Sequence, residues 1–531
     1  MRATTVVLVA AVATGLAACG STAAPSTKSG AISDFTFAIV SPATSLDWAS
    51  DCEIQTDGII DSLVTQPLEA LSSTNTFSPV LATSVSEPNE TTLVYHLRSG
   101  VKFSNGKPLT AADVVWSIEH YAKGSCTSTE MPQLKSVTAT GPLTVTVNLP
   151  APNPEARPEI ALNAYVQNAD FGEAHKKDLG TASAIPVGTG PYITTSYSTS
   201  SITLVRNDHY WGKEPSIKTL TFPVIQQDDS RELAFRSGSI DASSITDLKT
   251  LSTWKTLANT HTYIEQTSSE DFLGFDVDSS PFNDVHVRQA IAYAISPDAL
   301  AQAGFDNNVS HLSGGFVPAY ELSDVAGSLA NAQSFLASLP AYTHNLATAK
   351  AQMKLSSYPK GFSTSIWYIE TLPWEETVVL GIQQELKQIG INVTAKPVSE
   401  NLWFTDFFEG KLTGLNLATF FNAVNNDPSG LLTDVVGTAG KYSAGSENFS
   451  KFTSPTVENA LKTINSDAPP ATRWAATKVL MTQMAELEPY IPLWTEPDPI
   501  VISNSFTLTS PADFNLFNMA NGNWVYGIKA K

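Results

Sequence analysis

The sequence predicts a mixed α/β protein that is divided into two or three lobes. Its 531 residues exceed the size at which a single hydrophobic core stops growing, which is roughly 250–300 residues. Segments with the two-residue alternation of strands are interspersed with segments that carry apolar residues every three to four positions, as helices do. We find no internal repeat. This alternation favours lobes in which helices pack against sheets.

The first half of the chain contains clear strand and helix signals. Alternating apolar residues predict strands at 35–40 and 92–97, and the turn sequence SNGK follows at 104–107. Thr110, with Asp113 three residues later, resembles a capping box and begins a helix. The helix continues through the apolar stripe Val114, Val115, Ile118 and Ala122 to an end near Gly124.

Two further helices are predicted in the second half. Asp284 opens a helix over residues 285–295, whose apolar positions recur at helical spacing. A second helix covers residues 375–389 and ends at Gly390, a residue that is common just after a helix. The apolar alternation at 391–395 then predicts a strand directly after that glycine.

The amino-terminal residues resemble an export signal. Arg2 supplies a positive charge, and residues 6–15 are apolar or small. The apolar stretch is shorter than the roughly 20 residues that span a bilayer. Residues 16–19 read Leu-Ala-Ala-Cys, which resembles a bacterial lipobox. We therefore expect a signal peptide at 1–18 and, at 19–31, a lipidated Cys19 with a flexible tether; the alternative is secretory cleavage without a lipid.

Charge and cysteine content limit the classes of partner and the cellular compartment that we expect for the protein. The chain carries 31 Lys and Arg against 51 Asp and Glu, for a net charge of −20, and no basic run tracks a phosphate backbone. Such a surface repels nucleic acid and anionic lipid. Apart from Cys19, the cysteines are Cys52 and Cys126. They form either a disulfide, which an oxidising compartment permits, or two buried free thiols.

Segments spread over most of the mature chain carry a family resemblance. They are LVYHLRSGVKFSNGKPLTAADVV at 93–115, VGTGPY at 187–192, RNDHYWG at 206–212, AFRSGSIDA at 234–242, LGFD at 273–276 and VHVRQAIAYAI at 285–295. In this order they resemble the family 5 extracellular solute-binding proteins. These are the large oligopeptide, dipeptide and nickel receptors of ABC importers.

The resemblance implies a periplasmic-binding-protein-like fold with two lobes, three domains, a hinge and a ligand cleft between the lobes. It implies domain I at 32–75, 188–275 and 500–531, a nested domain II at 76–187, and domain III at 276–499. We therefore expect an extracytoplasmic monomer, anchored to the cell membrane by its lipid, that needs no cofactor. It would capture a peptide or another small solute and deliver it to an ABC permease through closure of the cleft.

A loop in domain III is the predicted determinant of specificity. In relatives that bind peptides, an aspartate shortly before an Asp-Pro pair binds the peptide amino terminus. Here Asp427 begins that pair, and Val424 occupies the anchoring position. A buried ammonium without a partner is costly, so either another carboxylate such as Asp427 replaces the aspartate or the ligand is not a peptide. The loop candidates are Phe420, Phe421, Asn422, Val424, Asn425 and Asp427. The asparagines would hydrogen-bond a sugar, a polyol or an amide, or would serve only the turn.

Other candidates for the cleft lie in predicted loops. Trp367, Trp374 and Trp403 would offer flat apolar faces to a ligand, and their alternative role is core packing. Thr44 and Ser45 follow the first predicted strand, in a loop that lines the cleft in family members. The alternative for this pair is a surface turn.

Signatures of enzymes are absent from the sequence. We find no G-x-S-x-G elbow, and none of the eight histidines has the spacing of a zinc-binding H-E-x-x-H helix. Residues 100–107 imitate a phosphate-binding loop, but Pro108 stands where Ser or Thr is required. We expect neither catalysis nor a bound metal cofactor. The alternative is a catalytic pair of the glycosidase type, formed by carboxylates that are far apart in the sequence. Ligands such as an opine or a metal chelate, and a sensory role without transport, also stay open.

Overall fold

The computed structural model describes the chain except for its first thirty residues and several short internal segments. The described residues are 31–51, 58–71, 76–129, 131–153, 156–312, 314–370, 372–399, 402–403, 406–407, 410–421, 427–437, 448–466, 468–510, 514, 519 and 521–531. The leader, Cys19 and most of the tether, Cys52, and the loop residues Asn422, Val424 and Asn425 lie outside them.

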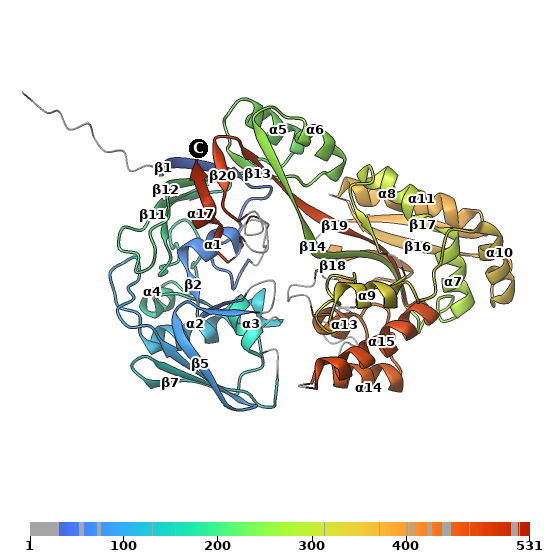
Figure 1. Cartoon of the computed structure of the whole chain (residues 1–531), viewed down its shortest axis with the longest axis horizontal. Coiled ribbons are helices and arrows are strands. Elements are labelled where there is room, and N and C mark those ends of the chain that lie inside the picture. Colours follow the sequence, from blue (N-terminus) through green and yellow to red (C-terminus); the bar gives the residue numbers. More distant parts are fainter. Residues whose placement is uncertain are drawn as a thin grey trace, which may run out of the picture.

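Two lobes are joined by long strands that run from one to the other (Figure 1). The crossing strands are β14 (Thr260–Phe275) and β19 (Tyr490–Ser503). They pair antiparallel from Thr260 opposite Ser503 to Gly274 opposite Tyr490. We call the body that contains the described amino-terminal residues the first lobe and the other body the second lobe.

One sheet extends through both lobes. Its order is β10-β11-β12-β1-β13-β19-β14-β18-β16-β17, with β15 paired to β19. The strands of this sheet, apart from the two crossing strands, are β1 (Ile32–Ala38), β10 (Tyr192–Ser198), β11 (Ser201–Arg206), β12 (Ile217–Pro223), β13 (Ala242–Ser244), β15 (Ser310–His311), β16 (Phe362–Ile369), β17 (Ile391–Val398) and β18 (Leu415–Phe421). The sequence predictions of strands near 35–40 and 391–395 are confirmed by β1 and β17.

The first lobe contains a second, four-stranded sheet. Its order is β5-β6-β8-β7, and α2 packs against it. The predicted strand at 92–97 is β6, and the predicted capping box at the start of α2 is present, with Thr110 and Asp113 bonding each other's backbone. The elements of this region are β2 (Gln66–Pro67), β3 (Glu69–Leu71), β4 (Phe77–Pro79), β5 (Ala82–Asn89), β6 (Thr92–Leu97), β7 (Ser136–Gly141), β8 (Thr144–Asn148), β9 (Tyr165–Val166), α2 (Ala111–Tyr121), α3 (Ala156–Asn163) and α4 (Ala169–Ala174).

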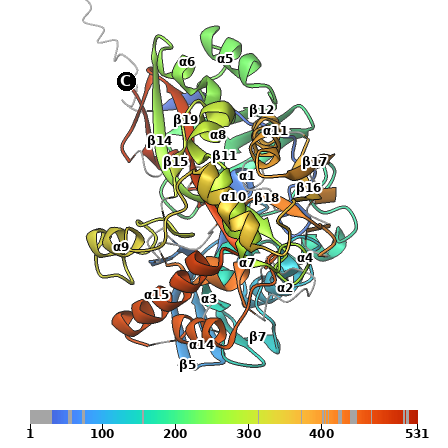
Figure 2. The same cartoon turned by 90° about the vertical axis from the view of Figure 1, so that its right-hand side faces the viewer.

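The remaining helices cover the large sheet. In the first lobe and at its upper edge they are α1 (Ile59–Val64), α5 (Asp228–Arg236), α6 (Leu251–Lys255) and α17 (Trp524–Gly527), beside the strands β20 (Phe506–Leu508) and β21 (Ile528–Ala530). In the second lobe they are α7 (Val285–Ala294), α8 (Pro297–Phe305), α9 (Leu329–Leu336), α10 (Leu346–Leu355), α11 (Pro373–Lys387), α13 (Ser429–Val435), α14 (Pro455–Ile464) and α15 (Pro470–Leu487). Figure 2 shows how these helices surround the strands of the second lobe.

Both predicted helices of the second half are confirmed. The side chain of Asp284 accepts a hydrogen bond from the His286 backbone at the start of α7, as its position predicts. Helix α11 begins two residues earlier than predicted, because Pro373 occupies its first turn, where the missing N–H costs nothing. Among the described residues no helix has the length and apolar character that crossing a membrane requires.

Candidate functional site

The predicted specificity loop begins where the second lobe meets the crossing strands. Strand β18 ends at Phe421, which lies opposite Ser269 of β14, and the loop residues 422–426 follow directly. On its other side, β14 pairs with β19 here, since Glu270 lies opposite Thr495. The described end of β18 therefore lies next to the segment that connects the lobes.

Two pairs of neighbouring carboxyl groups lie at this junction, of which Glu270, Asp271 and Glu321 are buried and Glu496 is half-buried. Glu270 and Asp271 are consecutive on β14, both are 0% exposed, and consecutive strand residues point to opposite faces of a sheet. The carboxyl group of Glu321 lies beside that of Glu270, and the carboxyl group of Glu496 lies beside that of Asp271. The hydroxyl of Thr419 also donates to Asp271, at 2.5 Å. The sequence showed no sign of these pairs, because partners such as Glu270 and Glu321 lie far apart in it.

Burial determines the protonation of these pairs. It raises the pKa of Glu270 and of Asp271 well above the usual range, and the second carboxyl of each pair adds repulsion. Burial also raises the pKa of Glu496 to about 7. Two neighbouring carboxyl groups repel each other when both are ionised, so each pair keeps a proton to a higher pH than an isolated carboxyl group does.

The structure places two aromatic candidates inside the core of the second lobe. Phe420 is 4% exposed and stacks on Phe272, with ring centroids 4.3 Å apart and planes at 18°. Trp403 is 4% exposed and stacks on Phe407 at 4.7 Å. These contacts match the core-packing alternative for Trp403, and they leave Phe420 no exposed face for a ligand.

The other two tryptophans are half-buried. The indole N–H of Trp367 donates to the backbone oxygen of Thr413 at 2.8 Å, and Lys396 lies over its ring at 4.3 Å. Trp374, in the first turn of α11, packs against Phe305 with centroids 4.8 Å apart. Neither tryptophan lines a described cavity. Two cavities, of about 290 and 380 Å³, are lined by second-lobe residues, and none of the predicted candidates is among those residues.

The candidates of the first lobe lie in the loop after β1. Thr44 is exposed, and its backbone N–H donates to the carboxylate of Asp51 at 2.8 Å. The Ser45 hydroxyl accepts a hydrogen bond from the Asp47 backbone at 3.0 Å. Both residues therefore fix the loop, and Thr44 is the one with exposed surface.

The last loop candidate, Asp427, is engaged within the second lobe. Its carboxylate accepts hydrogen bonds from the Arg473 side chain and from the Ser429 backbone N–H. Cys126, a predicted disulfide residue, is disulfide-bonded. Its predicted partner Cys52 lies outside the described residues, so this pairing stays a prediction. Among the described residues we find no group of three or more histidines, cysteines and acids placed to hold a metal ion.

Comparison with known proteins decides the family. The family model of bacterial extracellular solute-binding proteins, family 5 middle, matches residues 76–443. The chain belongs to this family. The match covers more than half of the sequence and includes all six segments that carried the resemblance.

Curated relatives of the chain are named for different ligands. The chain is 26% identical to the glutathione-binding protein GsiB of Salmonella paratyphi A, over 56% of this chain and 56% of that protein. It is 27% identical to the nickel-binding periplasmic protein of Escherichia coli, over 45% and 47% of the two chains. It is 22% identical to heme-binding protein A of Haemophilus influenzae, over 67% and 68%. The chain thus spans about half the length of the first of these relatives.

Solved structures confirm the fold over nearly the whole chain. The periplasmic binding protein DppA of Helicobacter pylori, in complex with the peptide STSA, superposes with a TM-score of 0.78 at 20% identity, covering 94% of this chain and 98% of that one. AgaA of Agrobacterium, in complex with agropinic acid, gives 0.77 at 20% identity, covering 94% and 99%. The fold is therefore that of the periplasmic-binding-protein-like receptors, as predicted.

Proposed function

We propose that this protein is an extracytoplasmic receptor that captures a small polar solute between its two lobes and delivers it to an ABC importer. The observation that supports the proposal most strongly is the crossing of β14 and β19 beside the end of β18. Strands that pass between lobes can bend as a hinge, so the two lobes can close on a solute that lies between them. Closure on the solute is the change that a permease can recognise.

We infer that the solute is not a peptide held by its amino terminus in the usual way. Val424 stands at the position of the aspartate that anchors peptides in relatives, and Asp427 is already bound by Arg473. A sugar, polyol, amide, opine or metal chelate is compatible with the asparagine-rich sequence of the loop. The different ligands named for the relatives show that similarity at this level does not select one of them.

A thermal-shift screen of the mature chain tests both statements. The panel contains di- to hexapeptides, glutathione, mono- and oligosaccharides, nickel chelates and agropinic acid. A true solute raises the melting temperature, because it binds the folded state alone. A strong rise with short peptides and none with the other compounds would overturn the inference from Val424. A chain that no compound in the panel stabilises would contradict capture of a solute of these classes.

Cys19 is the proposed lipid anchor. The Cys19→Ala variant is expected to leave the solute affinity unchanged and to release the protein from membranes into the medium or the soluble fraction. Membrane retention of this variant, measured by fractionation against wild type, would contradict the assignment.

A further inference from the structure

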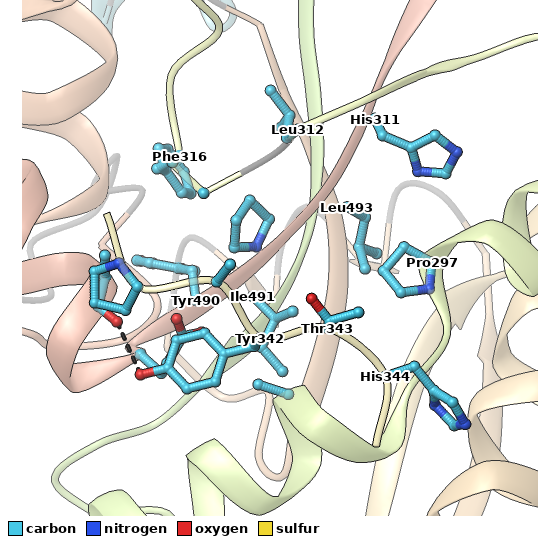
Figure 3. Close-up of a pocket in the computed structure, with 18 of the residues that line it drawn as sticks. Pro297, His311, Leu312, Phe316, Tyr342, Thr343, His344, Tyr490, Ile491 and Leu493 are labelled. Atoms are coloured by element: carbon cyan, nitrogen blue, oxygen red, sulfur yellow. Dashed lines mark hydrogen bonds between the residues drawn. The ribbon is translucent and has the colours of Figure 1, made fainter. Parts of the chain in front are cut away.

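The second lobe contains a cavity that is separate from the junction of the lobes. Its volume is about 290 Å³, and its described lining residues fall in 292–344 and 484–493, all in the second lobe. It lies between the end of α7, the start of α8, the end of α15 and the first residues of β19. Figure 3 shows Phe316, Tyr342 and Tyr490 toward one side of it and His311, Pro297 and His344 toward the other.

A buried acidic residue, Glu488, is among the residues that line this cavity. Glu488 is 3% exposed, and its Oε2 has no hydrogen-bond partner among the described residues. Leaving a buried acceptor unpaired costs on the order of 1–3 kcal/mol. The carboxyl therefore gains from a ligand that brings a donor.

Neighbouring groups do not supply that donor. Arg288 balances part of the charge of Glu488, but its N–H groups donate to the backbone oxygens of Phe282, Leu487 and Glu488. The hydroxyl of Tyr342 donates to the backbone oxygen of Ala485 at 3.0 Å. Burial accordingly raises the pKa of Glu488.

The other charged or titratable side chains of the lining, apart from Tyr342 and Tyr490, are Asp298, His311 and His344. None of the described lining residues is a lysine or an arginine, whereas Asp298 stands at the rim, 3.2 Å from His311. The described residues offer no metal-binding group of three ligands. Part of the wall is apolar and is formed by Leu312, Phe316, Met484, Tyr490, Ile491 and Leu493. A ligand of this cavity therefore combines an apolar body with a positively charged donor.

We propose that this cavity is a second binding site, which takes a small primary amine with an apolar body. The ammonium group donates to the Glu488 carboxyl, and the apolar body packs on Phe316 and Leu493. The positive charge of the ammonium group stabilises the ionised form of the Glu488 carboxyl.

Calorimetric titration of the mature chain with benzylamine tests the site. Benzylamine is expected to bind, while benzoate and benzyl alcohol, which have similar bodies and no ammonium group, are expected to bind at least about tenfold more weakly. Glu488→Gln should weaken benzylamine binding at least about tenfold. The matched control Glu486→Gln, an exposed position in the last turn of α15, should leave it unchanged.

A second variant tests the site independently in case the Glu488→Gln protein does not fold. Thr343 is exposed and lines the cavity, so Thr343→Trp fills it without disturbing the core. This variant should also abolish benzylamine binding and keep the wild-type melting temperature. The proposal is overturned if wild type does not bind benzylamine, if benzoate binds as well as benzylamine, or if folded Glu488→Gln or Thr343→Trp protein binds benzylamine like wild type.

Discussion

Asp427 and Arg473 form an ion pair in which one guanidinium nitrogen contacts both carboxylate oxygens. Nη2 of Arg473 lies 2.8 Å from Oδ1 and 2.6 Å from Oδ2, and each side chain is 20% exposed. Oδ1 also accepts a hydrogen bond from the Ser429 backbone N–H, which ties the carboxylate to the start of α13. The pair thus holds α13 against α15. It also binds the Asp427 carboxylate, which the sequence analysis considered as a possible anchor for the ligand.

Asp427→Ala is expected to lower stability by about 1–3 kcal/mol, because Arg473 and the Ser429 N–H both lose their acceptor. Thermal unfolding measures the effect. Asp427→Asn is the matched variant, since its side-chain oxygen still accepts from Ser429 while the charge is lost, and it should fall between Asp427→Ala and wild type. Unchanged stability of Asp427→Ala together with a loss of solute binding would show that Asp427 acts on the ligand.

Stability is expected to decrease between pH 5 and pH 8. A carboxyl whose pKa is higher in the folded state binds its proton more tightly there, so its contribution is complete below the unfolded pKa and is lost as the pH rises through the folded pKa. For Glu496 this window runs from about 4.5 to about 7. Glu270 and Asp271, whose pKa values are also raised, act in the same direction.

Glu496→Gln tests this origin of the pH dependence. The variant should show a smaller decrease in melting temperature from pH 5 to pH 8, because the amide does not ionise. Glu376→Gln, at an exposed position, controls for the general loss of one negative charge. Equal pH dependence of Glu496→Gln and wild type would contradict the role of the carboxyl pair.

Phe420→Ala is expected to destabilise the protein by about 3–5 kcal/mol, because it leaves a cavity beside Phe272 in a closely packed core. Unfolding of the whole chain by denaturant measures the decrease in the free energy of unfolding. Phe420→Leu keeps most of the volume and should cost less. If Phe420→Ala is as stable as wild type and binds solute more weakly, the ring contacts the ligand.

Reduction of the Cys126 disulfide is expected to lower the melting temperature. The Cys126 backbone N–H donates to the Ala49 oxygen at 3.1 Å, which places Cys126 near the segment that contains the predicted partner, Cys52. Peptide mapping without reductant should yield a cross-linked Cys52–Cys126 pair, and Cys126→Ser should destabilise by up to about 4 kcal/mol. Cys19→Ala is the control and should change neither result. A Cys126 paired to another thiol would contradict the prediction.

The sequence by itself determined the family, the alternation of strands and helices, and the caps of individual helices. Those features depend on residues close together in the chain, as the Thr110–Asp113 capping box and the Asp284 cap of α7 show. The resemblance also predicted a hinge between the lobes. This was possible because the motifs that carry the resemblance are short local segments in a fixed order.

The tertiary structure alone decided which candidate side chains are available to a ligand. The sequence predicted that Phe420 and Asp427 contact the ligand. In the structure Phe420 stacks on Phe272 and Asp427 pairs with Arg473, and both partners are distant in the chain. The carboxyl pairs Glu270–Glu321 and Asp271–Glu496, and the cavity beside Glu488, arise only when separate elements pack together. Burial and pairing depend on residues that are neighbours in space, and the local sequence does not identify those neighbours.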